Sequence, residues 1–437
     1  MRKMKKIKRG GKADETVEPS DEKKNNDLNP NLRQINGPVN VVRLEGTVGE
    51  IKKVIYLFFD FHMDLYVQTK CTNIYSKDVN MFFAESFYEL NKIDKKYDFF
   101  MEIRPLDIYS SGEDWVKKAK RKYIHEMMSL FSIIFKYDDK KNQVYISDQL
   151  KNIRLHYLDV RDYIQHHIIN FFNEALEIAN QIMFNQHVHV EQLDKIIEIS
   201  KAQKEMLDTT INIFMDPTIV QIKEKKPVIQ KVYMTPYTSN IEPEIVANLS
   251  NKIKNKYNHN DVQKKINIIF NDLIDQLKQI SNNISEAINK FNEYIQIVQI
   301  PWNKLIIGQN NYGVPKKEIR QINIDIINIC EDIDYQINKL FVNLTDIYFL
   351  RRFLDKDYIT NGIVFSGASH SLNYITYLVK YFDFKITHAA YAFDKNINQL
   401  NKITKERLIN NKAITDIFFP PELYQCSDIT HFPKNFA

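Results

Sequence analysis

Four short apolar runs constrain the fold of this chain more than any other feature. They cover residues 54–59, 97–103, 153–160 and 362–365, and are rich in β-branched and aromatic residues. Runs of this length and composition are typical of strands buried on both faces of a sheet. Helical patterns at about 78–94 and 114–136 separate them. Strands alternating with helices predict an α/β fold with a mostly parallel sheet flanked by helices.

The segment between the third and fourth runs has a different period. Its apolar residues recur in alternating four- and three-residue steps, which predicts a heptad-patterned helix over 262–300 that ends before Pro301. Residues 163–213, 242–257 and 316–345 also have helical patterns. We therefore expect a large all-α insertion over 163–339 that divides the α/β domain into 41–162 and 340–437. The apolar stripe is expected to pack within the chain, and a dimer seam is the alternative.

The positive charge of the chain is concentrated at its beginning. The formal net charge is +5, and residues 1–12 alone carry seven Lys and Arg residues and no acid. The remaining chain is close to neutral, so composition gives no support for a nucleic-acid-binding body. Residues 1–40 are charged and Asn-rich, and we expect a disordered basic tail. Only its first 12 residues are candidates for a nucleic-acid contact or a nuclear address.

Composition and the cysteines suggest a compartment. No apolar run approaches the ~20 residues needed to cross a bilayer, and the basic N-terminus lacks a signal-peptide core, so no membrane association is expected. Cys71, Cys330 and Cys426 are odd in number and far apart, which predicts unpaired thiols in a reducing, intracellular compartment. The abundance of Lys, Asn and Ile indicates an AT-rich genome, such as that of a large DNA virus or a protist. For a viral protein, the expected location is the host cytoplasm, the virus factory or the virion, with the nucleus possible through the tail.

Polar residues with metal and acid–base chemistry follow the predicted strands. Because the carboxyl ends of parallel strands share one edge of a sheet, we expect these side chains to meet in one crevice. The residues are Asp60 and His62 after the first run, Glu102 in the second, His156, Asp159 and Arg161 in the third, and Gly367 and His370 after the fourth.

Two histidines with carboxylates suit a divalent metal such as Mn, Co, Zn or Fe. We expect His62, His370 and Asp60 to bind the metal and Glu102 to act as general base. A positive side chain, Arg351 or Arg161, would stabilise the developing oxyanion. The secondary candidates for the site are His156 and Asp159.

The local sequence around His370 suggests how it is presented. We expect Gly367 to turn the chain tightly out of the strand and Ser371 to cap the following helix. The helix dipole at this end disfavours an imidazolium, which favours a neutral, metal-binding His370.

Three of these motifs resemble a known clan. Asp60-Phe61-His62 after a strand, Glu102 after the next, and Gly367-Ala368-Ser369-His370 before SLNYITYLVKYFDF are similar to landmarks of the clan of TraB and TIKI proteins, erythromycin esterase-like proteins and ChaN haem-binding proteins. An acidic, Arg-containing segment at 346–352 precedes the last motif, as in TraB and TIKI proteins. Uncharacterised giant DNA virus proteins carry similar landmarks.

This resemblance implies a metal-dependent hydrolase of the peptidase or esterase type. The similarity to ChaN proteins implies an alternative, in which the same histidines bind haem or another ligand. Phe59 stands where the clan has glycine, and the helical insertion is large. These departures favour a further alternative, a catalytically degenerate scaffold or interaction protein that binds a protein partner through 163–339.

Overall fold

The computed structural model describes residues 29–68, 70–103, 122–138, 143–160, 174–182, 184, 188–220, 243–298 and 316–436. Ordered structure begins earlier than the expected residue 41, because β1 (Gln34–Asn36) and the start of β2 (Asn40–Val48) precede it. Residues 1–28, including the basic cluster, lie outside the described residues.

A six-stranded sheet forms the centre of the fold. Its strand order is β10-β2-β3-β9-β5-β8, and β3, β9, β5 and β8 pair in parallel. The bounds are β3 (Ile51–Asp60), β5 (Tyr97–Met101), β8 (Ile153–Tyr157), β9 (Asn361–Gly367) and β10 (Lys385–Ala389). The four predicted runs are therefore strands, and the expected α/β class is confirmed. The fourth run, from the far end of the chain, lies between the first and second.

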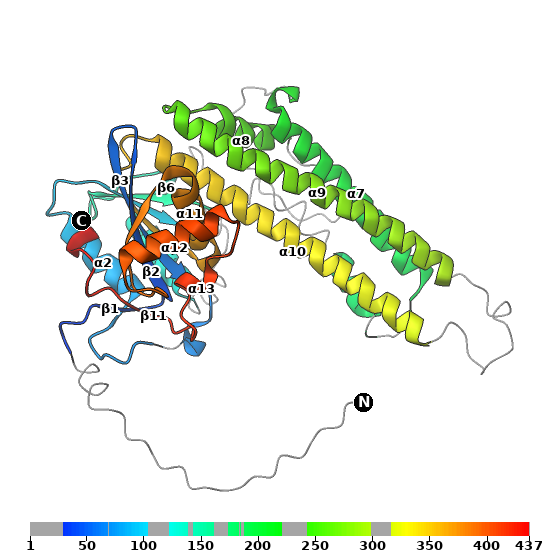
Figure 1. The fold of residues 1–437 in the computed structure, drawn as a ribbon, viewed down its shortest axis with the longest axis horizontal. Helices are drawn as coiled ribbons and strands as arrows, with labels where there is room; N and C mark the ends of the chain where they lie inside the picture. Colours follow the sequence, from blue (N-terminus) through cyan, green and yellow to red (C-terminus); the bar gives the residue numbers. More distant parts are fainter. Residues whose placement is uncertain are drawn as a thin grey trace, which may run out of the picture.

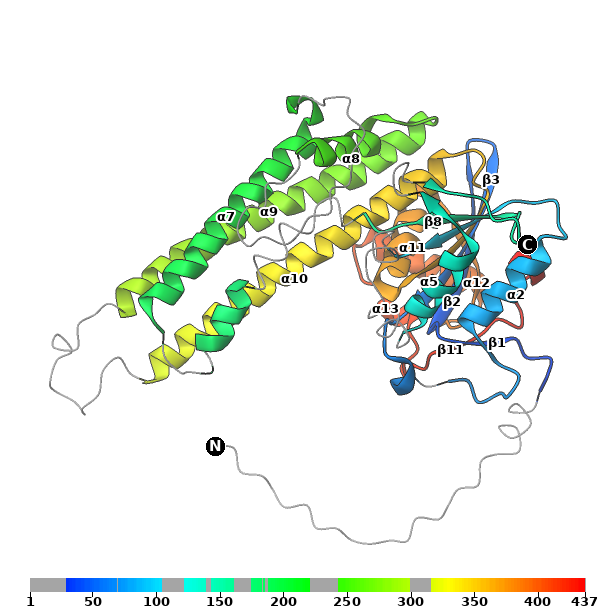
Figure 2. The same ribbon diagram turned by 180° about the vertical axis from the view of Figure 1, so that it is seen from behind.

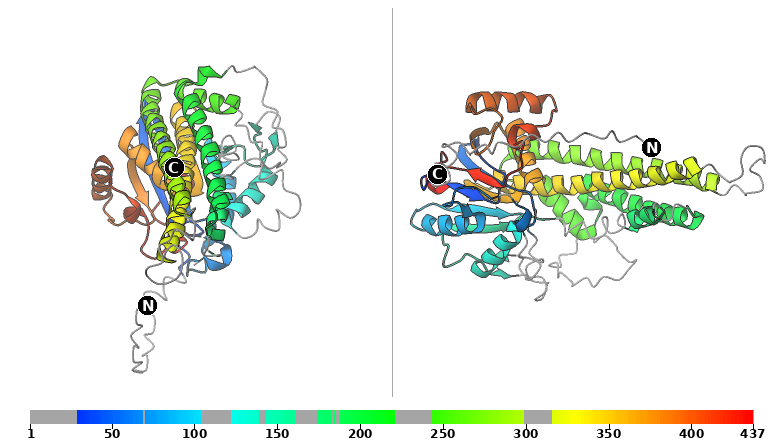
Figure 3. Two further views of the ribbon diagram at one scale, coloured as in Figure 1. Left: turned by 90° about the vertical axis from the view of Figure 1, so that its right-hand side faces the viewer. Right: turned by 90° about the horizontal axis from the view of Figure 1, so that it is seen from below.

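Helices cover both faces of this sheet. On one face lie α2 (Val79–Leu90) and α5 (Tyr123–Ile134), and on the other α11 (Ala368–Phe382) and α12 (Ile397–Ile409), as the right-hand view of Figure 3 shows. Alternate residues of each strand belong to two separate apolar cores: Phe58 and Phe365 pack toward α2, whereas Phe59 and Val364 pack toward α11. This alternation is the expected result of successive strand residues pointing to opposite faces.

A long helical arm projects from the sheet domain (Figures 1 and 2). It consists of α7 (Val190–Met215), α8 (Pro243–Asn255), α9 (Asn260–Val298) and α10 (Lys316–Asp355). The heptad helix is α9, whose apolar stripe is buried within the chain, and α9 packs against α7 and α10. The expected boundary at 339/340 lies inside α10, which continues from the arm into the sheet domain without a break.

Shorter elements complete the described chain. They are η1 (Leu65–Val67), β4 (Lys77–Asp78), β6 (Tyr137–Asp138), β7 (Gln143–Val144), η3 (Pro217–Ile219), α13 (Thr415–Phe418), β11 (Cys426–Asp428) and η5 (Lys434–Phe436). None of the helices in the described part of the chain is both long enough and apolar enough to cross a membrane.

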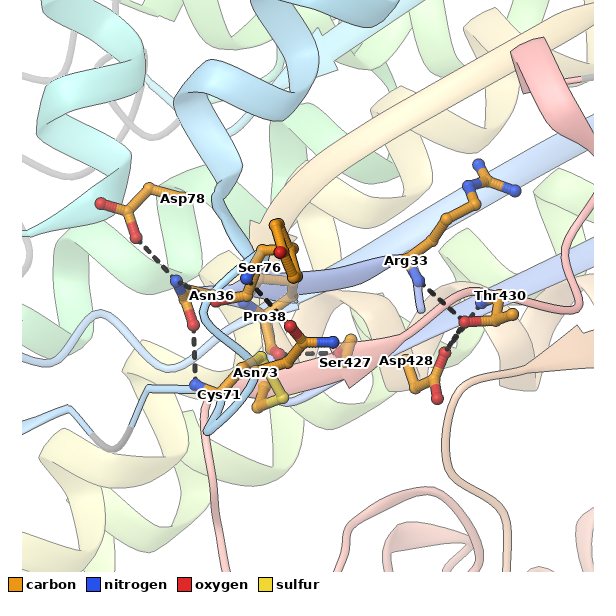
Figure 4. The surroundings of a disulfide bond; sticks show 12 residues. Arg33, Asn36, Pro38, Cys71, Asn73, Ser76, Asp78, Ser427, Asp428 and Thr430 are labelled. Atoms are coloured by element: carbon orange, nitrogen blue, oxygen red, sulfur yellow. Dashed lines mark hydrogen bonds between the residues drawn. A yellow bond between two sulfur atoms is a disulfide. The ribbon is translucent and has the colours of Figure 1, made fainter. Parts of the chain in front are cut away.

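The expectation of unpaired thiols is wrong for two of the three cysteines. Cys71 and Cys426 form a disulfide beside the small sheet β11-β1-β4 (Figure 4), and only Cys330, buried in α10, is a free thiol. Asn36 reinforces this corner, because its Oδ1 accepts the Cys71 backbone N–H at 2.7 Å and its Nδ2 donates to Asp78. The disulfide could not be predicted from the sequence, because 355 residues separate the two cysteines.

The disulfide is expected to stabilise the fold measurably. A crosslink that restricts the unfolded chain typically contributes about 2–4 kcal/mol. Thermal unfolding of the wild type should therefore occur at lower temperature when dithiothreitol is present. The Cys71→Ser variant is the control, since it should unfold at the temperature of the reduced wild type and not respond to the reductant. Equal melting temperatures for the oxidised and reduced wild type would contradict this expectation.

Candidate functional site

The polar residues that follow three adjacent strands meet at one edge of the sheet. In the parallel ladder, Asp60 at the end of β3 is opposite Gly367 at the end of β9, and Met101 of β5 is opposite Phe365. Glu102 follows β5, and its backbone N–H donates to the carbonyl of Phe365 at 3.2 Å. The register alone thus brings the first, second and fourth strand ends together.

His62 lies between two carboxylates. Its Nδ1 donates to Asp60 Oδ2 at 2.7 Å, and its Nε2 is 3.5 Å from Glu102 Oε2. The second Asp60 oxygen, Oδ1, is buried without a hydrogen-bond partner among the described residues. His62 has φ of 53°, a left-handed conformation that is uncommon outside glycine and is found often at functional sites. In this ion-free arrangement Asp60 orients His62, and direct metal binding by Asp60 stays a prediction.

His370 is buried between two other carboxylates. Its Nδ1 lies 2.5 Å from Asp346 Oδ1, and its Nε2 lies 2.9 Å from Glu102 Oε1. Asn373 holds the other Asp346 oxygen with a hydrogen bond of 2.7 Å. Asp346 comes from α10, and no role was assigned to it from the sequence. The sequence feature that could have indicated Asp346 is the presence of an acidic residue among the apolar residues of a predicted helix that precedes the last motif.

Gly367 is needed here for close approach, and not for the tight turn that we expected. Its backbone has ordinary angles, φ −52° and ψ 146°, and its N–H donates to Glu102 Oε2 at 2.5 Å. A Cβ at this position would lie 2.9 Å from His62 Nε2 and 3.2 Å from Glu102 Oε2. Ser371 does not cap α11, which begins at Ala368; its hydroxyl is buried beside that of Ser366.

The charges of the cluster are strongly coupled. Burial lowers the pKa of His370, but Asp346 and Glu102 outweigh burial and raise that pKa well above its ordinary value. Burial also lowers the pKa of His62, yet hydrogen bonds to Asp60 and Glu102 raise it to about 9. Both imidazoles are therefore cationic in this arrangement. Without a bound ion, two carboxylates thus outweigh one helix dipole at His370, and a neutral, metal-binding His370 stays a prediction.

Of the two candidate arginines, Arg351 does not lie at the site. Arg351 donates from Nη2 to the Lys256 carbonyl at 2.6 Å and lies over the ring of Tyr257, so it anchors the link between α8 and α9. Arg161 lies outside the described residues. Asp159 is buried, and its charge contributes to raising the pKa of Tyr374.

His156 belongs to a separate buried network. Its Nε2 donates to Asp98 Oδ1 at 2.7 Å, and Arg154 makes two further bonds to the same carboxylate. The ring of His156 stacks on Phe100 with centroids 4.7 Å apart. Burial lowers the pKa of His156 to about 4 despite the bond to Asp98. This neutral histidine therefore links β5 to β8 and is not a member of the His62–His370 cluster.

Phe59 is a core residue. It is fully buried within β3, where it pairs with Asn40 and Ser366, and its ring packs edge-on against Phe419. The strand continues through Asp60. No turn occurs at Phe59, so the local fold does not require glycine there.

Comparison with known proteins gives a family. The family model described as "Family of unknown function (DUF5847)" matches residues 33–437. The chain belongs to this family. Uncharacterized protein R706 of Acanthamoeba polyphaga mimivirus is 41% identical over 419 residues, covering 94% of this chain and 98% of that protein. Uncharacterized protein R160 of the same virus is 35% identical, with coverage of 94% and 98%. No solved structure matches the chain.

Gly367→Ala is expected to displace His62 without unfolding the protein. The alanine Cβ meets the far end of the His62 side chain, which can rotate away, and φ of −52° suits alanine. We expect a loss of stability below about 1 kcal/mol. The imidazole NMR signals of His62 should shift, whereas those of His156 should not. Unchanged His62 signals would show that the close approach does not constrain this ring.

The His156–Asp98 network predicts a pH dependence of stability. The folded pKa of about 4 lies below the ordinary 6.5, so the unfolded chain takes up the proton first as the pH falls. Stability is lost between about pH 6.5 and 4, by up to about 3 kcal/mol. His156→Gln keeps an N–H donor for Asp98 but does not titrate. Urea unfolding at pH 7, 6 and 5 should show a smaller loss for this variant than for the wild type, and parallel losses would refute the assignment.

Proposed function

We propose that the chain is a metal-dependent hydrolase whose divalent metal is held by His62, His370 and Glu102. The observation that carries this proposal is the orientation of the two imidazoles. Each donates Nδ1 to a buried carboxylate and presents Nε2 to Glu102. Carboxylate–histidine pairs of this kind fix the ring and raise the basicity of the metal-binding nitrogen in metalloproteins. Two histidines and one glutamate form a common set of ligands in zinc hydrolases.

The donor atoms are of the types that bind one divalent ion, and small shifts would bring them to bonding distance. Ligands about 2.0–2.2 Å from an ion lie roughly 3–3.5 Å from one another, and the two Nε2–carboxylate distances are 2.9 and 3.5 Å. Among the described residues, no group of three or more His, Cys, Asp or Glu side chains is placed so that it could hold a metal ion without a shift. Binding therefore requires that Glu102 exchange its direct contacts with both imidazoles for bonds to the ion.

Each residue of the site would have a separate role in the proposed hydrolysis. A bound divalent metal supplies Lewis acidity and activates water. Asp60 and Asp346 hold the two imidazoles, and the Gly367 N–H holds Glu102. Glu102 suits a ligand better than the general base that the sequence suggested, because its carboxylate lies between both imidazoles. The first turn of α11 supplies backbone N–H groups at the same edge, which suit a developing oxyanion.

The substrate class and the alternatives rest on different grounds. An ester or amide substrate follows from the resemblance to TraB, TIKI and erythromycin esterase-like proteins. Haem is less favoured than a single ion, since the His370 side chain is 4% exposed and both of its nitrogens contact carboxylates.

Partner binding is a second candidate function: the arm projects from the sheet domain (Figure 1), and Tyr335 and Ile268 on it are 66% and 57% exposed.

The disulfide indicates the kind of compartment in which the protein would reside. Cys71–Cys426 would persist in oxidising surroundings, which include virion surfaces. The relatives come from a giant virus, as expected from the composition. Among the host cytoplasm, virus factory, virion and nucleus, we propose the virion.

Metal loading tests the proposed ligands. Wild-type protein dialysed against Zn²⁺, Mn²⁺ or Co²⁺ should retain one ion per chain by elemental analysis, and His62→Ala and His370→Gln should retain almost none. Asp346→Asn should bind about 10–100-fold more weakly, because only the orienting partner is lost. The control is His431→Ala, which changes an exposed histidine that hydrogen-bonds to the Ala389 carbonyl. If the wild type and the His62 and His370 variants retain equal metal, the proposal is refuted and the scaffold function becomes the better account.

Hydrolysis is tested separately. The metal-loaded wild type should cleave p-nitrophenyl acetate or a fluorogenic peptide, and removal of the metal by a chelator should abolish the activity until metal is restored. A rate equal to that of His370→Gln under all conditions would contradict hydrolysis even if metal binds.

A further inference from the structure

A cavity of about 360 Å³ lies on the face of the sheet that α2 covers. Its walls come from residues 30–35, β3, α2 and the C-terminal segment 429–436. None of the residues that line it belongs to the His62–His370 cluster. Its volume falls within the range of roughly 300–1,000 Å³ that is usual for small-molecule sites.

The floor and one wall of the cavity are aromatic. The lining includes Tyr56 and Phe58 of β3, Phe82 of α2, and Phe432 and Phe436 of the C-terminal segment. These rings pack on one another: Tyr56 and Phe436 meet edge-on at 5.1 Å between centroids, and Phe82 and Phe436 at 5.9 Å. Packed rings form a fixed apolar surface that offers offset or edge-on contacts to another planar ring.

The acidic groups on the wall are already neutralised. Glu85 on α2 forms an ion pair with Lys77, and Glu89 on the same helix pairs with Lys92 at 2.7 Å. The two lining carboxylates therefore contribute little net negative charge to the cavity.

Two lining cations have no such partner. Arg33 is half-buried, its Nη1 donates to the Phe432 carbonyl at 3.0 Å, and no carboxylate of the described residues lies within 4.0 Å of its guanidinium. Lys434, which is exposed, also forms no ion pair within the described part of the chain. Burial lowers the pKa of Arg33, and Tyr56 and the nearby Asp428 offset this only in part. The Oδ1 of Asp428 accepts hydrogen bonds from the backbone N–H and the hydroxyl of Thr430. A half-buried guanidinium that makes no direct ion pair is stabilised by an anion bound against it.

We propose that this cavity binds a small anion that carries a planar apolar ring, such as an aromatic carboxylate or phosphate monoester. The ring packs against Tyr56 and Phe436, and the anionic group lies between Arg33 and Lys434. The guanidinium fork suits the paired oxygens of a carboxylate or phosphate. Because none of these residues takes part in the proposed metal site, this inference stands or falls independently of the hydrolase proposal.

A matched pair of ligands isolates the contribution of the anion. Naphthalene-2-sulfonate and its neutral isostere naphthalene-2-sulfonamide are titrated into the full chain by calorimetry. We expect the sulfonate to bind at least about tenfold more tightly, since a charge-assisted hydrogen bond to arginine is worth about one power of ten or more. Naphthalene-2-carboxylate and 2-naphthyl phosphate, used as competitors, distinguish the two classes of anion. Equal affinity for sulfonate and sulfonamide, or no binding of the sulfonate, overturns the proposal.

Variants locate the binding to this cavity. Lys434→Met and Arg33→Met should each weaken sulfonate binding, with a larger effect for the half-buried arginine, whereas Arg33→Lys should retain part of the affinity. Lys412→Met is the control, because Lys412 is exposed and does not line the cavity. Ser86→Phe fills the cavity from α2 and should abolish binding of both ligands while the melting temperature stays near that of the wild type. Unchanged affinity in Ser86→Phe, or equal losses in Lys412→Met and Lys434→Met, would place the ligand elsewhere and refute the inference.

Discussion

The insertion of β9 between β3 and β5 is the interaction on which the rest of the structure depends. All seven residues of β9 are buried, and the strand forms a parallel ladder on each side. Without it, β10-β2-β3 and β5-β8 would be two separate sheets with exposed edges, since no other ladder in the described part of the chain joins them. The same pairing sets the register of the site, because Gly367 is held between the end of β3 and Glu102.

The strands that the sequence predicted are those buried on both faces. Their apolar runs are visible without knowledge of the fold. The antiparallel strands β2 and β10 were missed for a physical reason: β2 contains Arg43, Glu45 and Gly46, which interrupt its apolar pattern, and its polar groups are satisfied in part by partners on other strands. Arg43, for example, donates to Tyr56 on β3 and to Thr387 on β10. Side chains that find their partners across strands leave no periodic signal along the chain.

The site was predictable to the extent that strand ends determine it. His62, His370 and Glu102 come together because parallel strands share a carboxyl edge, which the sequence pattern already implied. Asp346 and Arg351 could not be distinguished in that way. They are five residues apart on α10, so their side chains point about 140° apart around the helix, and only the packing of α10 determines that Asp346 faces His370.

The continuity of α10 has a consequence for how this family can vary. A helix of 40 residues is roughly 60 Å long, and it begins in the arm and ends in the sheet domain, where it contacts α11 (Figure 1). Asp346, whose carboxylate orients His370, thus lies on the same helix that packs against α9. Deleting the predicted insertion, residues 163–339, would therefore cut through α10 and not remove the arm as an independent unit. A shorter protein that kept the sheet but lost residues 163–339 would retain only the last turns of this helix, and it would need a different scaffold to hold Asp346 in place.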